Sequence, residues 1–385
     1  IEQKYPLKTG LCQQCGIMQL IDAFPPESLQ PTVSWITYTE PEGHLDQTAN
    51  YLSTILSPNA FVLGISFKDN STLERLEKRG FNVKLLEPDI DLLISHPGAG
   101  VETIQQQLTI SRAQRLSEKY GKADAIIVRH ILEHVYDLSK FFAAIKELLK
   151  PTGYVVFEVP DCSKQLELLD YSTIWEEHAL YFTPETYKTC LIRHGFTIEK
   201  LEIIPAPIEN PMVAIVRLDE LVHSEKINGS IFNQSLFTSE ISGAVEEEIK
   251  RVQVFTNSFA NYKKAVQDFF SKKKVAVFGA GHFATMLINL FELSVSFVVD
   301  DNIHKQGFYM PGSRVPIYGS DVLNKPKELC SDLDDIDLCI LTVNPIVEEK
   351  IVANHRSVKF RSFCPVSHLS FLNEISPTKE ISSEI

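Results

Sequence analysis

Short apolar runs alternate with helical patterns between Ala60 and Val216, and this alternation restricts the fold more than any other feature of the chain. The predicted strands are 60–66, 83–87, 123–129, 153–160 and a closing strand through 213–216. The predicted helices are 71–79, 138–149 and 184–194, and they end at Gly80, Pro151 and Gly195. Runs as apolar as 153–160 are typical of parallel sheets that are covered on both faces. The pattern therefore predicts an α/β fold with a doubly wound sheet.

A second α/β unit is predicted near the C-terminus. Residues 274–284 read as a strand, a glycine turn and the start of a helix, and further strands are expected at 296–301 and 337–342. A polar connector lies before this unit, and its amphipathic helix over 245–270 is expected to pack between the two units. The predicted parts are 1–45, 46–216, 217–270 and 271–385, with a polar tail after Leu372 that is expected to fray.

Size and charge narrow the class of protein. A chain of 385 residues is too long for one ordinary core, and its hydrophobic content of 44% is that of a folded protein. The net charge of −13 argues against a nucleic-acid surface, which needs clustered Lys and Arg. Apolar runs stay far below the roughly 20 residues that span a bilayer, and no signal peptide is recognised. We therefore expect a cytoplasmic protein without a membrane partner.

The cysteines do not form a disulfide pattern, because seven of them are scattered through a long chain. Only Cys12 and Cys15 are organised, as Cys-x-x-Cys followed by Gly16, which is half of a zinc knuckle. A structural zinc normally takes four ligands, and the sequence has no second such pair. Either the other ligands precede Ile1, or His44 or a remote cysteine completes the set, or the pair binds no metal.

The stretch 175–183 (WEEHALYFT) concentrates groups that can carry chemistry just after a predicted strand. Ligands of open α/β sheets bind beyond the carboxyl ends of the strands. The ordinary pKa of histidine suits proton abstraction near neutrality, and an adjacent carboxylate can orient the ring. Glu177 and His178 are therefore a candidate base and its support, flanked by Trp175 and Tyr181. The alternative is a surface histidine on an acidic turn.

Two strand-turn-helix segments are candidates for nucleotide binding. Residues 279–284 (GAGHFA), which begin with Gly279, match a permissive dinucleotide fingerprint, but many glycine turns bind no dinucleotide. The earlier segment runs from Gly64 through a turn and a helix to a strand that ends in Glu87, whose carboxylate can accept hydrogen bonds from ribose hydroxyls.

The order of motifs resembles the three-part sugar C-methyltransferases of deoxysugar pathways. The matching segments are 12–20 (CQQCGIMQL), 129–134 (RHILEH), 148–154, 158–161 (EVPD), 177–182 and 301–312. These enzymes carry a zinc-binding N-terminal piece, a class I S-adenosylmethionine-dependent methyltransferase core and a Rossmann-like C-terminal domain. The resemblance covers nearly the whole chain, and it implies the same fold, the same cofactor and a structural zinc.

The resemblance also implies roles for individual residues. The cofactor pocket would be lined by Gly64, Ser66, Asp69, Glu87, Arg129 and His130. The base would be His178, supported by Glu177, and the enolate oxyanion would be stabilised by Tyr38 or Tyr181. The substrate would contact Trp175, Asn210, Gly279, Lys305 and Gln306, with the C-terminal unit closing over it. The alternative for that unit is dimerisation or a purely structural role.

Three departures from the family pattern bear on these roles. The cofactor turn has Ser66 and Asn70 where relatives have glycines, and a Cβ at these positions can obstruct the methionine moiety. The substrate loop reads 207–211 (PIENP) in place of a glycine-rich loop, and the first cysteine pair is missing.

We expect transfer of a methyl group to a carbon beside a ketone of a nucleotide-linked deoxy-keto sugar or a related small metabolite. The alternatives are O- or N-methylation of a similar substrate, and a binding protein that no longer methylates.

Overall fold

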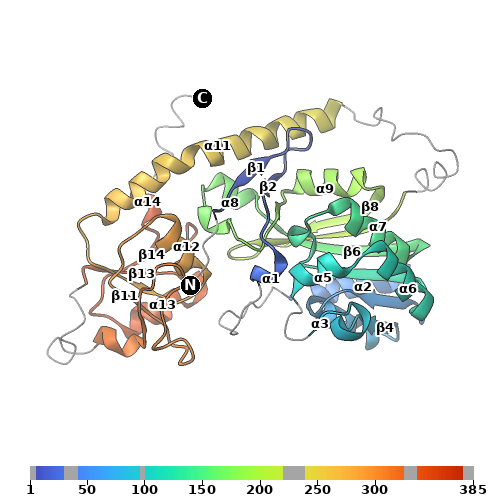
Figure 1. The fold of residues 1–385 in the computed structure, drawn as a ribbon, viewed down its shortest axis with the longest axis horizontal. Coiled ribbons are helices and arrows are strands. Elements are labelled where there is room, and N and C mark those ends of the chain that lie inside the picture. The colour runs from blue at the N-terminus through green and yellow to red at the C-terminus, as the bar shows by residue number, and fades with distance from the viewer. Residues whose placement is uncertain (1–5, 30–41, 96–99, 220–238, 325–335, 376–385) are drawn as a thin grey trace.

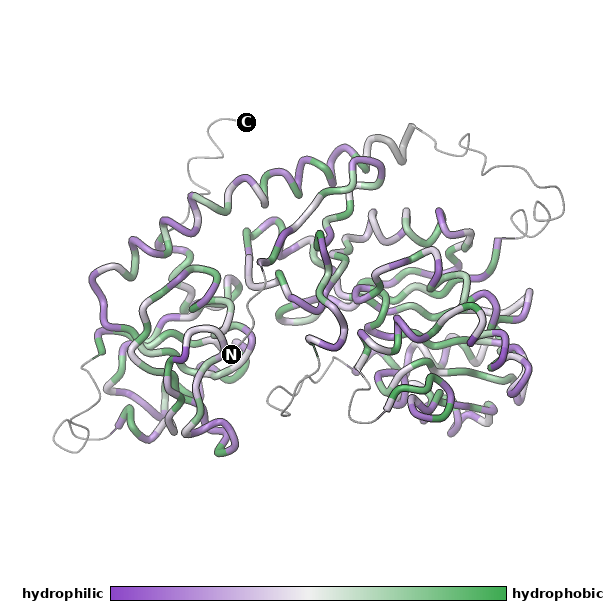
Figure 2. Tube along the Cα trace, viewed as in Figure 1, coloured by the Kyte–Doolittle hydropathy of each residue, from purple (hydrophilic) through white to green (hydrophobic). Residues whose placement is uncertain are grey.

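The computed structural model describes residues 6–29, 42–95, 100–219, 239–324 and 336–375. Two α/β units lie side by side, and the long helix α11 (Ser239–Phe270) runs along both of them (Figure 1). The hydrophobic residues of each unit gather on its central strands, while polar residues follow the outer helices (Figure 2). No helix in the described ranges is both long enough and apolar enough to cross a membrane.

The first unit is built on a six-stranded sheet in the order β4-β3-β5-β6-β9-β8. The strands are β3 (Phe61–Gly64), β4 (Asn82–Leu85), β5 (Ala123–Arg129), β6 (Leu149–Asp161), β8 (Phe196–Ile203) and β9 (Asn210–Leu218). The first four run parallel, whereas β9 pairs antiparallel with both β6 and β8. All the strands predicted between 60 and 216 are confirmed; β5 has the predicted ends, and the ends of the others are shifted.

Helices cover this sheet on both faces. They are α2 (Leu45–Ile55), α3 (Asn70–Glu77), α4 (Pro88–Asp91), α5 (Val101–Gln107), α6 (Ile110–Tyr120), α7 (Leu138–Leu148), α8 (Ser163–Glu167) and α9 (Pro184–Arg193), with short 3₁₀ turns η1 (Phe67–Asp69), η2 (Leu132–His134) and η3 (Tyr171–Thr173). Side chains define the ends: Asp137 caps α7, and Thr183 caps α9 before Pro184.

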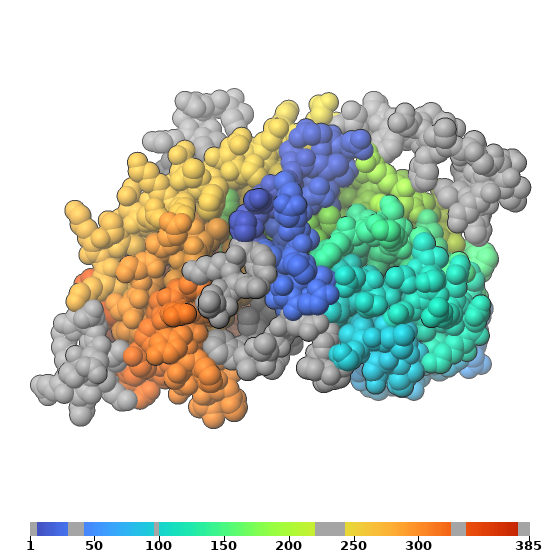
Figure 3. Space-filling model, in the orientation of Figure 1, coloured from blue at the N-terminus to red at the C-terminus, as the bar shows by residue number. Residues whose placement is uncertain are grey.

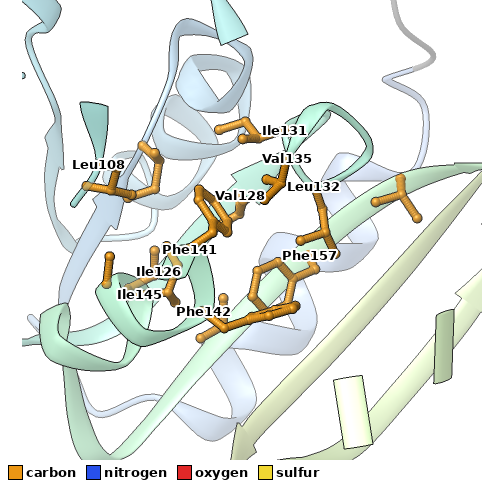
Figure 4. Close-up of a cluster of buried hydrophobic side chains, with 14 of the residues drawn as sticks. Leu108, Ile126, Val128, Ile131, Leu132, Val135, Phe141, Phe142, Ile145 and Phe157 are labelled. Atoms are coloured by element: carbon orange, nitrogen blue, oxygen red, sulfur yellow. The ribbon is translucent and has the colours of Figure 1, made fainter. Parts of the chain in front are cut away.

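The core of this unit lies where β5 and β6 face α7. Phe142 of α7 contacts Phe157 of β6 edge-on, with ring centroids 5.5 Å apart (Figure 4). Residues of the same cluster that follow β5, such as Ile131 and Leu132, are fully buried. The backbone that leaves β5 is therefore held by buried apolar contacts, which fixes the position of the polar residues between them.

An N-terminal hairpin joins the first unit through a separate small sheet. Strands β1 (Thr9–Leu11) and β2 (Met18–Leu20) pair antiparallel, and β2 pairs in turn with β7 (Leu180–Tyr181). The short helix α1 (Pro26–Leu29) follows the hairpin. In the space-filling view this segment occupies the space between the two units (Figure 3). No strand was predicted in this segment, because strands of three residues leave almost no periodic signal.

The C-terminal unit has a parallel five-stranded sheet in the order β12-β11-β10-β13-β14. Its elements are β10 (Val275–Phe278), α12 (His282–Leu290), β11 (Phe297–Val299), β12 (Ile317–Tyr318), η5 (Ser320–Asn324), β13 (Leu338–Leu341), α13 (Pro345–Asn354), β14 (Phe360–Ser362) and α14 (Leu372–Ile375). The predicted second α/β unit is confirmed.

One hydrophobic cluster connects the N-terminal hairpin, the first unit, α11 and the C-terminal unit. It includes Met18 of β2, Tyr181 of β7, Phe255 of α11 and Leu287 of α12, all almost fully buried. Helix α11 contacts elements of all three, namely β1, α8, α9 and α14. The division into four parts stays a prediction. Because the cluster is continuous, each part packs against the others.

Candidate active site

The predicted catalytic stretch forms a loop between η3 and β7, here called the His178 loop (residues 174–179). Strand β2 holds its end: Met18 is paired with Tyr181 and Gln19 with Leu180, and the Leu20 N–H donates to the Ala179 carbonyl over 2.9 Å. The hairpin that carries the cysteine pair is thus hydrogen-bonded to the backbone directly after His178.

Tyr181 holds the start of the same loop. Its hydroxyl accepts a hydrogen bond from the Trp175 N–H (3.0 Å) and donates to the Trp175 carbonyl (3.1 Å). The side chain is buried, and burial holds the pKa of the phenol well above its usual value. Tyr181 was expected to donate to a substrate oxyanion, but its one proton is used on Trp175, so we no longer give it that role. Tyr38, the other expected donor, lies outside the described residues.

His178 lies next to two residues of η2, the turn that follows β5. The His178 and His134 rings meet edge-on, with centroids 4.8 Å apart. A nitrogen of each ring and a carboxylate oxygen of Glu133 all lie within 4.8 Å of one another. Glu133 is buried, and its Oε2 atom has no hydrogen-bond partner among the described residues. A buried, unpaired carboxylate oxygen is costly, and this cost makes the cluster a candidate functional site.

Carboxylates surround His134. Its Nδ1 atom donates to the Glu177 carbonyl (2.9 Å) and lies 3.2 Å from Glu102 Oε1. Burial opposes a charge on the ring, but the Glu102 hydrogen bond and the nearby Glu133, Glu102 and Glu177 charges outweigh it and raise the pKa of His134. Burial, aided by the Glu102 charge, raises the pKa of Glu177 to about 7. The cluster therefore combines a stabilised imidazolium with a carboxyl that is partly protonated near neutrality.

Glu133, His134 and His178 also have the chemistry of a metal-binding set, with two imidazoles and a carboxylate. A cation bound by all three would take up the ring nitrogen that His178 needs to accept a proton. The same atoms therefore support either metal binding or base catalysis, and the basic role is the one that the sequence predicted.

The cofactor turn after β3 is built without glycine conformations. Ser66 is extended (φ −135°, ψ 169°) and Asn70 is helical (φ −54°, ψ −48°). The Ser66 hydroxyl accepts a hydrogen bond from the Lys68 N–H over 3.2 Å, so the side chain caps η1. Neither position lies in the left-handed region that favours glycine. The replacement of both glycines is therefore compatible with this turn, and the buried Ser66 side chain points into its own cap.

Asp69 organises this turn from inside. Its Oδ2 atom accepts hydrogen bonds from the Ile65 N–H (2.7 Å) and the Ser66 N–H (2.9 Å), and Oδ1 accepts from the Arg129 N–H (2.8 Å). Asp69 is fully buried, and burial raises its pKa to about 7 in spite of these donors. Gly64 is needed for close packing, because a Cβ there would come within 2.7 Å of Leu73 Cδ1. Asp69 and Gly64 therefore fix the backbone of the turn.

Arg129 and His130, at the end of β5, are held by Glu158 of β6. The Arg129 guanidinium donates to Glu158 through Nε (2.6 Å) and Nη2 (3.0 Å), and Nη1 donates to the Lys68 carbonyl (2.7 Å). His130 has a left-handed backbone (φ 51°), and its ring bridges Glu158 (3.1 Å) and Glu133 (3.3 Å). Burial opposes ionisation of Glu158, but hydrogen bonds from His130, His44 and Arg129 hold its pKa well below the usual value. This network links the cofactor edge to Glu133.

Glu87 and three exposed apolar side chains lie beyond the carboxyl ends of β3 and β4. Glu87, just beyond β4, is about half exposed and pairs with Lys84, so its carboxylate remains accessible to ribose hydroxyls. Phe67, the first residue of η1, is 53% exposed beyond the neighbouring strand. Ile90 and Leu93, which follow Glu87, are also exposed apolar residues. An acid and exposed apolar side chains at adjacent strand ends suit a ribose and an adenine ring.

The predicted substrate residues fall into two places. Trp175 lies in the His178 loop and stacks on His178, with centroids 5.3 Å apart. Asn210 begins β9, and its side chain accepts the Ala206 N–H (3.0 Å). In the C-terminal unit, Lys305 pairs with Asp300 (3.1 Å) and Gln306 donates to the Asp300 carbonyl (3.0 Å).

Asp300 also contacts the glycine turn that precedes α12. Asp300 Oδ2 accepts the Ala280 N–H over 2.8 Å, so a carboxylate already sits on a backbone donor of the turn that begins at Gly279. An anionic phosphate would meet this negative charge. The geometry gives no support for phosphate binding at Gly279, Lys305 or Gln306, and their expected substrate contacts remain predictions.

Cys12 and Cys15 lie at the tip of the β1–β2 hairpin. Gly16 adopts φ 75° and its N–H donates to the Cys12 carbonyl (2.9 Å), which makes the tight turn that the motif predicted. In the described ranges, Glu133, His134 and His178 form the one group of three metal-type ligands, so the thiols have no third ligand there. The described residues therefore do not fit a structural zinc, which takes four.

Several polar residues of the site were not predicted. Glu102, Glu133, His134, Glu158 and His282 received no role from the sequence, although four of them lie in segments singled out as motifs. The sequence does contain one indication of this site, namely two histidines, His130 and His134, close to Glu133 within a single motif. Glu102 carried none, because it reaches His134 only through the packing of α5 against η2.

Comparisons with known proteins match this chain to methyltransferases. A family described as "Methyltransferase domain" matches residues 39–201, and one described as "C-methyltransferase C-terminal domain" matches residues 234–333. The C-methyltransferase NovU of Streptomyces niveus is 22% identical over 341 residues, which cover 83% of this chain and 78% of NovU. The predicted methyltransferase fold, resemblance and cofactor are confirmed.

Solved methyltransferase structures share less sequence identity with this chain than NovU does. An N1-methyltransferase of Burkholderia thailandensis, crystallised with 1,6-didemethyltoxoflavin and S-adenosylhomocysteine, gives a TM-score of 0.33 at 16% identity over 46% of this chain and 80% of its own. The CcbJ methyltransferase of Streptomyces caelestis gives 0.33 at 11% identity, over 48% and 94%.

Proposed function

We propose that this S-adenosylmethionine-dependent methyltransferase methylates a carbon next to a ketone, with His178 as the general base. The substrate class that we propose is a nucleotide-linked deoxy-keto sugar or a related small metabolite. Carbon methylation is supported by the name of the C-terminal family match and by that of the relative NovU. The observation that carries the proposal is the meeting of His178 with His134 and Glu133 beyond the end of β5.

His178 removes the proton. A carbon beside a ketone is only weakly acidic, so its methylation needs a base within hydrogen-bond reach of the C–H bond. His178 is half-buried, on a loop whose backbone is fixed by β2 and Tyr181. The proton moves to a ring nitrogen of His178, and the electrons of the C–H bond pass into the enolate of the substrate.

His134 and Glu177 provide the electrostatic environment for this step. The imidazolium form of His134, favoured by Glu102, lies beside His178 and supplies positive charge where the enolate develops negative charge. Glu177, with a pKa of about 7, is partly neutral near that pH and adds less opposing negative charge than an ordinary carboxylate. In this proposal His134 provides the stabilisation of the enolate oxyanion that was expected of Tyr181.

The cofactor edge holds the methyl donor. When bound, S-adenosylmethionine supplies an electrophilic methyl group to the substrate carbon and leaves as S-adenosylhomocysteine. Glu87 is placed to accept hydrogen bonds from its ribose, and Phe67 offers an exposed apolar surface at the neighbouring strand end. Asp69 and the Arg129–Glu158 pair keep these strand ends in register.

Product analysis tests the proposal. We would incubate the enzyme with methyl-¹³C-labelled S-adenosylmethionine and a nucleoside-diphosphate 4-keto-6-deoxy sugar, and record ¹³C–¹H correlation spectra of the product. A labelled methyl bonded to a sugar carbon is expected. A methyl on oxygen or nitrogen would assign the enzyme to the alternative class. Absence of binding heat with S-adenosylmethionine would contradict the cofactor site itself.

A further inference from the structure

We propose that His282, in the C-terminal unit, is a positioning residue that holds Trp175 and, through it, His178. This inference rests on the proposed role of His178 as base. It gives the C-terminal unit a defined part in the reaction without a contact to the substrate phosphates.

The three rings form a continuous stack. Trp175 and His282 are stacked with centroids 3.8 Å apart and an interplanar angle of 29°. Trp175 and His178 are stacked with centroids 5.3 Å apart and an angle of 16°. Because aromatic contacts of this kind favour defined ring orientations, a displacement of the His282 ring changes the position that is best for Trp175, and then for His178.

Two of these rings, Trp175 and His282, are hydrogen-bonded to the same backbone oxygen. The Ser172 carbonyl accepts hydrogen bonds from the indole Nε1–H of Trp175 and from Nε2 of His282, each over 3.1 Å. A carbonyl cannot donate, so His282 carries a proton on Nε2. Burial lowers the pKa of His282 to about 4, and the ring is therefore neutral near pH 7. A neutral ring with a fixed tautomer suits a structural contact.

The anchor point of His282 is rigid. His282 is the first residue of α12, directly after the turn whose Ala280 N–H is held by Asp300. The following helix is buried through Ala284 and Leu287, which belong to the cluster that also contains Tyr171 and Tyr181. The start of α12 also contacts η3, from which the His178 loop departs. Movement of His282 relative to the loop would therefore disturb a shared core.

Two His282 variants and a matched control test this inference. His282→Ala removes both the stacking and the hydrogen bond, whereas His282→Phe keeps an aromatic ring and loses only the donor. His368→Ala is the control, because His368 is an exposed histidine of the same unit. Turnover would be measured with the keto-sugar probe over a range of pH, together with S-adenosylmethionine affinity and the thermal midpoint.

We expect His282→Ala to lower kcat by about 10- to 100-fold, since small misplacements of a catalytic group have effects of this size. The cofactor Kd should stay within about twofold, because the turn after β3 is held by Asp69 and its contact with Arg129 and not by His282. His282→Phe should recover a large part of kcat, and His368→Ala should match the parent. Parental kcat in both His282 variants would overturn the inference.

A double variant separates positioning from an independent effect. If His282 acts through His178, adding His282→Ala to His178→Asn should cause no further loss of kcat. A full additional loss in the double variant would overturn the inference. The His178 ring resonances can be assigned by their loss in His178→Asn, and the Trp175 ring shifts them. They should move in His282→Ala and stay unchanged in the His368→Ala control.

The two proposals can fail separately. Full turnover of His178→Asn would refute the proposed base, yet the NMR shift of His178 would still report whether His282 positions it. Loss of activity in His178→Asn with unchanged resonances in His282→Ala would refute only the inference. If His282→Ala does not fold, His282→Phe carries the same comparison.

Discussion

The cofactor edge and the His178 loop are held in different ways. At the cofactor edge, Asp69, Arg129 and Glu158 bond to neighbouring strands of one sheet. The His178 loop is held by β2 from the N-terminal hairpin, by His134 from η2 and by His282 from the C-terminal unit. One region thus depends on the sheet to which it belongs, and the other depends on three separate parts of the chain.

This difference explains why a methyltransferase core would carry two additional parts. The sheet alone fixes strand ends, and these are enough to form a cofactor pocket. A base on a loop needs its own supports, because loops otherwise move more than the elements they connect. We infer that perturbing the supports affects catalysis more than cofactor binding, and the predictions below test this separation.

The largest effect is expected at the base. His178→Asn should keep the fold and the S-adenosylmethionine affinity but lower kcat by about 10²- to 10⁴-fold, the usual loss for a positioned base. Steady-state kinetics and calorimetry with the cofactor check this. His368→Ala again serves as the control, and turnover near the parental rate in His178→Asn would remove the loop from the mechanism.

A support of the loop should show an intermediate effect. Tyr181→Phe deletes the hydroxyl that bonds both polar groups of the Trp175 backbone, and we expect a loss of about 1–3 kcal/mol in the free energy of unfolding. Tyr187→Phe is a matched control, because the buried Tyr187 hydroxyl has no hydrogen-bond partner among the described residues. Urea unfolding measures both. Equal losses in the two variants would contradict the support role of Tyr181.

The raised pKa of Glu177 makes the free energy of unfolding depend on pH. Burial raises its pKa from 4.5 to about 7, so the folded chain holds this proton more tightly than the unfolded chain does. The stabilisation is complete below pH 4.5 and is lost as the pH rises towards 7. Glu177→Gln cannot titrate, and its unfolding free energy should fall less than that of the parent between pH 5 and 7.5, as measured in urea. Its kcat should fall less than that of His178→Asn. An unchanged pH slope would argue against a buried, titrating Glu177.

The smallest effect is expected at the cofactor turn. Ser66→Gly restores the residue type of related enzymes, but Ser66 already adopts an extended backbone that needs no glycine. The variant should bind S-adenosylmethionine within about twofold of the parent and lose about a few tenths of a kcal/mol from the lost cap. Calorimetry and urea unfolding measure these two quantities. A tenfold gain in affinity would show that the Ser66 side chain obstructs the pocket.

The sequence predicted those parts of the site that depend on neighbours along the chain. Strand β5 was predicted with its exact ends, because its apolar residues, Ala125 to Val128 above all, form a short run that is typical of a buried strand. Glu87 was predicted to bind ribose because an acid after the second strand has a fixed place in such sheets, and it lies just beyond β4 as expected. His178 was singled out because it lies within a dense run of polar and aromatic residues, and its role as base stays a prediction.

Contacts between distant segments could not be predicted in this way. Tyr181 was assigned to the substrate, whereas its hydroxyl holds Trp175, and only the loop backbone reveals this use. His282 lay within a glycine motif that suggested phosphate, yet its ring stacks on a residue 107 positions earlier, at Trp175. Composition and spacing do not encode which surfaces of two units meet.

Exchange of the substrate's α-proton tests the central claim most directly. The enzyme would be incubated in deuterated water with the keto-sugar probe and S-adenosylhomocysteine, so that the proton can be removed while no methyl group is available. The parent should incorporate deuterium at the carbon next to the ketone, and His178→Asn should incorporate it at least about 100-fold more slowly, as expected for loss of a general base. Exchange at the parental rate in His178→Asn would contradict the account.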